Sequence, residues 1–189
     1  KLAYVHAELA RTDKLKRLGD AAQGKTPVSS DQVVSYGGAS DGTIDLAPLH
    51  IKDNNGELTF SGATAQGSYS PSTQAAHLVM QMASLAMDMA ANPASGDKGG
   101  QLRIEGVAVK GDTHLGKSKL SVGSTELSIK HLGVKIADDH QFALDDVHQV
   151  TDTHEDGDTL GGQVSYQVGA VKANGADLGK GQLVLKLSG

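Results

Sequence analysis

The chain has 189 residues, a formal net charge of −5 at pH 7, no cysteine and only 3% aromatic residues. The acidic balance, without any dense basic stretch, argues against a nucleic-acid partner, and the lack of cysteine excludes disulfides and thiolate metal sites. The 24 glycines suit turns and bulges better than packed helices. We expect the first elements to be a short helix, or the remnant of a longer connection, within Lys1–Leu18, and a polar linker over Gly19–Ser30.

After this linker, apolar residues alternate with polar ones, as in half-buried strands, but the alternation slips by one residue in mid-strand. A β-bulge or sharp bend has this effect, because one extra residue changes the face to which all later side chains point. The slip occurs five times, between these apolar groups: Ile44/Leu46 and Leu49/Ile51, Met80/Met82 and Leu85/Met87, Leu102/Ile104 and Val107/Val109, Leu127/Ile129 and Leu132, and Val164/Tyr166/Val168 and Val171.

Turn signals separate the predicted strands, and Asn55-Gly56 and Asn174-Gly175 are the strongest hairpin signals. The sequence therefore predicts an all-β fold, an antiparallel meander of long, bulged strands in a curved sheet. We divide it into residues 1–31, a helix and linker, and residues 32–189, one β-rich domain. The expected strands are Gln32–Tyr36, Thr43–Lys52, Gly56–Gly62, Ala63–Ser70, Thr73–Met89, Gln101–Lys110, Thr113–Val122, Ser124–Ala137, Gln141–Thr153, Thr159–Val171, Val171–Ala173 and Lys180–Ser188.

The segment Ala75–Ala91 is ambiguous, because its Ala, Met, Leu and Gln residues are good helix formers. Its apolar residues nevertheless repeat the slipped alternation, so we predict a strand, with a helix as the alternative. Polar residues interrupt it often enough to argue against a membrane span. If it is a strand, its apolar residues form a candidate surface for an apolar ligand. These residues are Met80, Met82, Leu85, Met87 and Met89.

Two short motifs match the spacing of enzyme signatures. Gly19–Thr26 has the spacing of a phosphate-binding loop, but the residues before it are charged where that loop needs a buried strand. Gly38–Gly42 has the spacing of a nucleophile elbow around Ser40, but it leads into a predicted strand where the elbow needs a helix. A nucleotide-binding protein or a hydrolase is therefore a disfavoured alternative, and we predict no catalytic residue and no cofactor.

No metal site is expected either. Asp152–Asp158 resembles the first half of a calcium loop, but Gln163 stands where a bidentate glutamate is needed, so we favour an acidic hairpin turn. The histidines have no zinc-binding spacing, and we expect them to be solvated residues at turns and strand edges. They are His6, His50, His77, His114, His131, His140, His148 and His154.

From about Leu18 onwards, the order of several short segments resembles the YdgA-like family of bacterial cell-envelope proteins of unknown function. The segments are Gly24–Pro27, Ile44–Leu49, Gly56–Gly62, Gly67–Pro71, Leu102–Val107 and Gly175–Leu183. The resemblance implies a periplasmic β-rich body without catalytic residues, anchored in the inner membrane. It also implies that this chain is a piece lacking the anchor and a C-terminal region.

Two functions are compatible with these patterns, and we predict the first, with the second as the alternative. The first is a non-enzymatic structural or scaffolding domain of the envelope, in which the chain itself closes the apolar face of the sheet. The second is a module that binds lipid or another apolar ligand on an open apolar groove; another envelope protein is a further possible partner. Architecture alone is weak evidence for either function.

Overall fold

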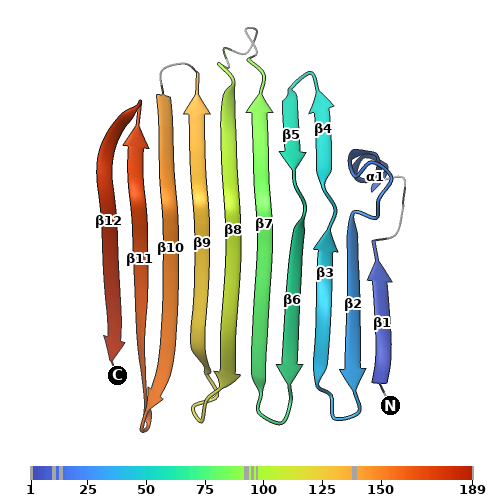
Figure 1. Ribbon diagram of the computed structural model, residues 1–189, viewed down its shortest axis with the longest axis vertical. Coiled ribbons are helices and arrows are strands. Elements are labelled where there is room, and N and C mark those ends of the chain that lie inside the picture. Colours follow the sequence, from blue (N-terminus) through green and yellow to red (C-terminus); the bar gives the residue numbers. More distant parts are fainter. Residues whose placement is uncertain are drawn as a thin grey trace.

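The computed structural model describes residues 2–9, 12, 15–91, 94, 96, 98–137 and 140–188. Nearly all of them lie in one open, curved antiparallel sheet (Figure 1). The predicted all-β fold is therefore confirmed. The strands are β1 (Leu2–Glu8), β2 (Val28–Ser35), β3 (Ser40–Leu46), β4 (Leu49–Asp53), β5 (Gly56–Phe60), β6 (Ala63–Ser70), β7 (Ala75–Met89), β8 (Gly100–Leu115), β9 (Ser121–Ile136), β10 (His140–Asp156), β11 (Thr159–Ala173) and β12 (Ala176–Ser188).

The strands follow one another across the sheet in the order β1-β2-β3-β6-β7-β8-β9-β10-β11-β12. Short β4 and β5 continue the lines of β3 and β6, and β5 pairs with both β4 and β7. The helix α1 (Lys16–Ala21) lies at the edge of the sheet and contacts β4 (Figure 1). Every other contact between described elements joins neighbouring strands, so no described element packs on either face of the sheet.

This single-layer arrangement leaves almost no core. The buried apolar residues among those described are small: Ala21, Ala22, Val122 and Ala143. Large apolar side chains stay partly exposed, since one layer of strands has nothing to pack against. A sheet of this kind needs a partner on its apolar face to gain the free energy that burial normally supplies.

The predicted slips all fall in one row that crosses the sheet. In the strand pairs from β7 to β11 the register is the same on both sides of this row, but the residues of the row itself are not paired. Between β11 and β12 the register shifts at this level, around Val171. We call this row the kink line. It contains Ala47-Pro48, Ser61-Gly62, Ala83, Gly106, Lys130, Asp146 and Gly169.

The backbone at the kink line departs from the extended conformation. Gly106 has φ +63° and Asp146 has φ +51°, both left-handed values that do not occur in a regular strand. At the break between β5 and β6, the Ser61 hydroxyl accepts a hydrogen bond from the backbone N–H of Ser84 on β7. Because all the strands slip together, their apolar residues return to the same face on both sides of the kink line.

The N-terminal segment differs from the expectation. The short helix exists, but it occupies Lys16–Ala21, and Leu2–Glu8 is a strand that pairs with β2 along its whole length. Alternating Tyr4, His6 and Glu8 suit this pairing, which a local assessment of helix propensity does not take into account. The expected linker is also shorter, because β2 begins at Val28.

Further along the chain, the strand predicted within Ala75–Ala91 is confirmed as β7, and the helical alternative is wrong. Several boundaries differ from the expectation; for example, β12 begins at Ala176 and not at Lys180. The predicted strand Thr43–Lys52 is broken into β3 and β4 at the kink line, where Pro48 cannot donate a ladder hydrogen bond. The predicted strand Gln101–Lys110 is part of the longer strand β8, which ends at Leu115, and the predicted strand Thr113–Val122 is divided between the end of β8, a turn and the start of β9.

Candidate apolar binding face

On one face of the sheet, the row of paired residues nearest to the kink line is apolar on each side of the line. Residues paired across antiparallel strands point to the same face, so the rows can be followed through the register. On one side the row contains Val28, Leu46, Ala63, Met82, Val107, Ile129, Val147 and Val168. On the other side it contains Leu49, Phe60, Leu85, Ile104, Leu132, Leu144 and Val171.

We call the face that bears these two rows the apolar face. The next row, with Ile51, Leu58, Met87 and Leu102, is apolar too, so the apolar area extends away from the kink line. No charged side chain belongs to these two apolar rows, although charged residues are 21% of the sequence. The row with Glu105, His131 and Asp145, which lies between the second apolar row and the kink line, points to the opposite face. The distribution of side chains between the two faces therefore makes the sheet strongly amphipathic.

The predicted ligand-surface residues lie together in β7, at the middle of this face. Met80 and Met82 are on one side of the kink line, and Leu85, Met87 and Met89 are on the other. The first four are half-buried between neighbouring strands, whereas Met89 is exposed. Sequence reasoning missed their partners on the flanking strands, because cross-strand neighbours depend on the register.

The two apolar rows extend from β3 and β4 to β11. Strands lie about 4.8 Å apart, so this distance across the sheet is roughly 30 Å. An acyl chain spans about half of the hydrocarbon core of a bilayer, which is about 30 Å thick. The rows are thus long enough for a whole acyl chain to lie across the strands.

The opposite face, which we call the charged face, has cross-strand ion pairs. Asp145 on β10 is the centre of one group, with Oδ1 2.6 Å from His131 Nδ1 and Oδ2 2.7 Å from Lys172 Nζ. The Lys172 ammonium group, and after it His131, holds the pKa of Asp145 below its ordinary value. The group connects β9, β10 and β11, and it keeps these charges away from the apolar rows.

Similar pairs occur along the rest of the charged face. Arg103 donates two hydrogen bonds to the Asp88 carboxylate, of 2.6 and 2.8 Å, and Lys52 donates one to Glu57. Several histidines that we expected to be solvated residues at turns and edges instead contact carboxylates on neighbouring strands. These contacts are His6–Asp31, His50–Glu57, His77–Asp112, His131–Asp145 and His148–Glu126. The alternation of polar and apolar residues places these histidines on the charged face, but their carboxylate partners can be identified only when the strand register is known.

The edge strand β1 is attached to β2 by one such group. The Tyr4 hydroxyl donates a hydrogen bond to Asp31, and His6 Nδ1 lies 2.7 Å from the same carboxylate. Hydrogen bonding to Asp31, and then to Glu8, raises the pKa of His6. The hydrogen bond from Tyr4, and then that with His6, lowers the pKa of Asp31.

These shifts predict that the pairing of β1 depends on pH. The raised pKa of His6 gives stability that is fully present below its ordinary value of 6.5 and is lost as the pH rises through the raised value. The lowered pKa of Asp31 gives stability that is present above 3.8 and is lost as the pH falls through the lowered value. Hydrogen exchange, corrected for intrinsic rates, should therefore show that the β1 amides are best protected at pH values between the lowered pKa of Asp31 and the raised pKa of His6.

In His6→Gln the loss of protection on the alkaline side should disappear, while the amides of the central strand β8 serve as an internal control. Equal pH dependence in His6→Gln and in the unmodified chain would contradict the prediction.

The structure also places the two enzyme-like motifs. In a phosphate-binding loop the glycine-rich turn precedes a helix, but here Gly19 lies inside α1 and Lys25 follows the helix end. Ser40 begins β3 and pairs with Tyr69, one row away from the pairing of Ser68 with His77, so Ser40 and His77 point to opposite faces. These arrangements do not match either motif's chemistry.

Ser68, His77 and Asp112 form one row on the charged face, a combination that the sequence analysis did not identify. The His77–Asp112 contact measures 2.6 Å, but the two side chains are 48% and 70% exposed. In a serine-hydrolase triad the aspartate is buried and fixes the histidine, so this open row lacks that feature.

Asp152–Asp158 forms the hairpin between β10 and β11, with its turn at Gly157 and Asp158. The part of the chain that the structure describes contains no cluster of three metal-ligating side chains, and no helix in it is long and apolar enough to span a membrane.

Comparison with known proteins decides the family. A model of bacterial proteins of unknown function, DUF945, matches residues 1–189, the whole chain. The chain belongs to the DUF945 family. Protein YdgA of Escherichia coli (strain K12) is 26% identical to it over 188 residues, which are 98% of this chain and 37% of YdgA. The predicted resemblance to the YdgA-like family is thereby confirmed.

This DUF945 chain spans little more than a third of the length of the curated relative that it matches. No solved structure matches it. The family description assigns no activity, so the arrangement of side chains on the two faces is the basis for any proposal about function.

Proposed function

We propose that this chain is a non-enzymatic β-sheet module of the bacterial envelope, located in the periplasm, which binds lipid acyl chains on its apolar face. The observation that supports the proposal best is the pair of uncharged rows beside the kink line, which no described element covers. An acyl chain lying along these rows would be removed from water by residues such as Met82 and Leu85. Each buried methylene contributes about 0.8 kcal/mol.

The composition of the rows suits a variable apolar ligand. All 4 methionines of the chain lie in β7, on the apolar face. Methionine side chains are flexible and polarisable, so they adapt to chains of different length and unsaturation. The charged face would meanwhile remain in water, where its ion pairs are already formed.

A photocrosslinking experiment tests the proposal. The photoreactive residue p-benzoylphenylalanine replaces Val107, on the apolar face, or its neighbour Ala108, on the charged face. The protein is illuminated in vesicles of phosphatidylethanolamine and phosphatidylglycerol and is then analysed by intact mass spectrometry. We expect a lipid adduct at Val107 and none at Ala108. Equal adducts at both positions, or adducts at neither, would overturn the proposal.

The second candidate is a structural or scaffolding domain whose apolar face is covered by protein. It is favoured by the length of YdgA, of which this chain spans 37%, since the remainder of such a protein includes residues available to cover the face. In that case the photoreactive residue at Val107 should form protein–protein crosslinks in the longer protein, and no lipid adduct.

A further inference from the structure

A shallow cavity of about 360 Å³ lies on the apolar face, over the neighbouring strands β2, β3, β6 and β7 (Figure 1). We call it the glycine notch. At its centre Gly42 pairs with Gly67, and neither residue has a side chain to fill the space above the backbone. Neither glycine has a left-handed backbone conformation, so no turn requires glycine at these positions. Glycine inside a strand often marks a place where a ligand approaches closely.

Side chains of the apolar face surround the glycine pair. They belong to three successive rows: Ser30, Ile44 and Ala65; Gln32 and Leu78; and Ser40 and Tyr69. The notch lies inside the sheet, so described strands form all of its walls. Ile44 and Ala65 are followed on their strands by Leu46 and Ala63, and the notch therefore adjoins one of the two apolar rows beside the kink line.

The notch also contains polar groups, which the apolar rows lack. The polar residues of the apolar face that line it are Ser30, Gln32, Ser40 and Tyr69. Their side chains form no hydrogen bond with any residue that the structure describes. The hydroxyl groups and the amide can both donate and accept hydrogen bonds, and none of them is charged. Such a set of groups suits an uncharged ligand that bears hydroxyl groups.

The surroundings of the notch disfavour an anionic ligand. The strands β1, β2, β3, β6 and β7 contain no lysine or arginine. Their acidic residues all lie on the charged face, and Asp31 and Asp41 are directly behind the notch; the others are Glu8, Asp45 and Asp88. On β8, Lys110 also points to the charged face, opposite Glu126. The cations of α1 lie beside β4, beyond the kink line. A phosphate group in the notch would lose hydration with no cation to replace it.

We propose that the glycine notch binds the uncharged, hydroxyl-bearing headgroup of a lipid, of which diacylglycerol is the simplest example. The proposal rests on the lipid binding proposed above and specifies the class of lipid. One acyl chain lies along the row of Leu46, Ala63 and Met82, and the glycerol end enters the notch and forms hydrogen bonds with its polar side chains. A phospholipid can still place an acyl chain on the apolar rows, but its phosphate stays outside the notch.

Two lipids with the same NBD-labelled acyl chain test the proposal by fluorescence titration. They are diacylglycerol, with a hydroxyl group at the third glycerol position, and phosphatidic acid, with a phosphate there. We expect diacylglycerol to bind about tenfold more tightly, or better. If the two lipids bind equally, the inference about the notch fails while the proposed lipid binding stands. If neither binds, both fail.

Matched substitutions locate the headgroup. Tyr69 and Tyr166 both lie on the apolar face and are 44% and 40% exposed, but Tyr166 lies outside the notch. Tyr69→Phe should weaken diacylglycerol binding about threefold to tenfold, as expected for the loss of one hydrogen bond, whereas Tyr166→Phe should leave it unchanged. Gln32→Leu in the notch and Gln149→Leu outside it form a second pair with the same expectation.

A third pair of substitutions separates the notch from the net charge of the chain. Ser40→Lys places an ammonium group in the notch and should strengthen phosphatidic acid binding about tenfold. Thr151→Lys adds the same charge to the same face outside the notch and should not have this effect. Equal effects of the two members in any of these pairs would overturn the proposal.

Discussion

Val107→Asp should abolish, or weaken at least tenfold, the binding of a phosphatidylethanolamine whose acyl chain bears a fluorescent NBD group. Val107 lies between Met82 and Ile129 in one of the two rows beside the kink line. A carboxylate there would have to lose its hydration when an acyl chain covers the row, and an unpaired charge in apolar surroundings is strongly unfavourable. Tenfold weaker binding corresponds to about 1.4 kcal/mol.

The control for this prediction is the adjacent residue. Ala108 pairs with Gln81 and Ser128, so it points to the charged face. Ala108→Asp adds the same charge to the same strand and should leave the fluorescence titration unchanged. If Ala108→Asp weakened binding as much as Val107→Asp does, the lipid would not be bound on the apolar face, and net charge would be the better explanation.

Gly123→Ala should lower the free energy of unfolding by about 3 kcal/mol, because it combines backbone strain with a collision. Gly123 in β9 has φ +133°, and a Cβ atom there would lie 2.1 Å from the backbone oxygen of Asp112 on β8. A backbone atom in a ladder cannot move aside as the end of a flexible side chain can. Since small proteins are stable by only about 5–15 kcal/mol, the effect should be large in a urea denaturation curve.

Gly111→Ala is the matched control, because Gly111 also lies in a central strand near this end of the sheet. Its backbone is not left-handed, and the nearest atom to an added Cβ is Thr125 Oγ1 at 3.8 Å, an ordinary contact. The free energy of unfolding should change by less than about 0.5 kcal/mol. Comparable losses in the two variants would show that any side chain in this region is disruptive and that the backbone of Gly123 has no special role.

The long strands could be predicted from the sequence because their pattern is local. The step from Met82 to Leu85, repeated in other segments, identified both the strands and the slip within them. The alignment of the slips in one line could not be derived in the same way, since it requires the register of every hairpin. Loops of different length, such as those after Met89 and Leu115, separate the strands and hide that register from a single sequence.

The N-terminal segment shows a different limit. The residues from Leu2 to Glu8 have no strong local preference, and their conformation is determined by pairing with β2, about 25 residues later in the chain. For the same reason, only part of the candidate surface could be predicted from the sequence. The residues of β7 were found from their own strand, whereas Ile104 and Ile129 became part of the surface only through the register.

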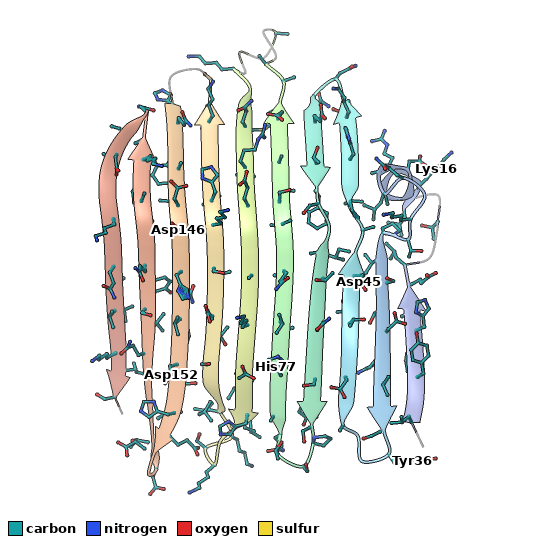
Figure 2. The ribbon with its side chains drawn as sticks, in the orientation of Figure 1. Lys16, Tyr36, Asp45, His77, Asp146 and Asp152 are labelled. Carbon is teal, nitrogen blue, oxygen red and sulfur yellow. The ribbon has the colours of Figure 1, made fainter. Side chains whose placement is uncertain are left out.

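Figure 2 shows side chains on every strand and no second layer, with Asp45, His77, Asp146 and Asp152 distributed over the breadth of the sheet. Because the strands from β7 to β11 are interrupted at the same level, the two apolar rows run perpendicular to them. Each added hairpin would therefore lengthen these rows by about 10 Å. In such an architecture, duplication of hairpins is a direct evolutionary route to proteins whose apolar rows differ in length.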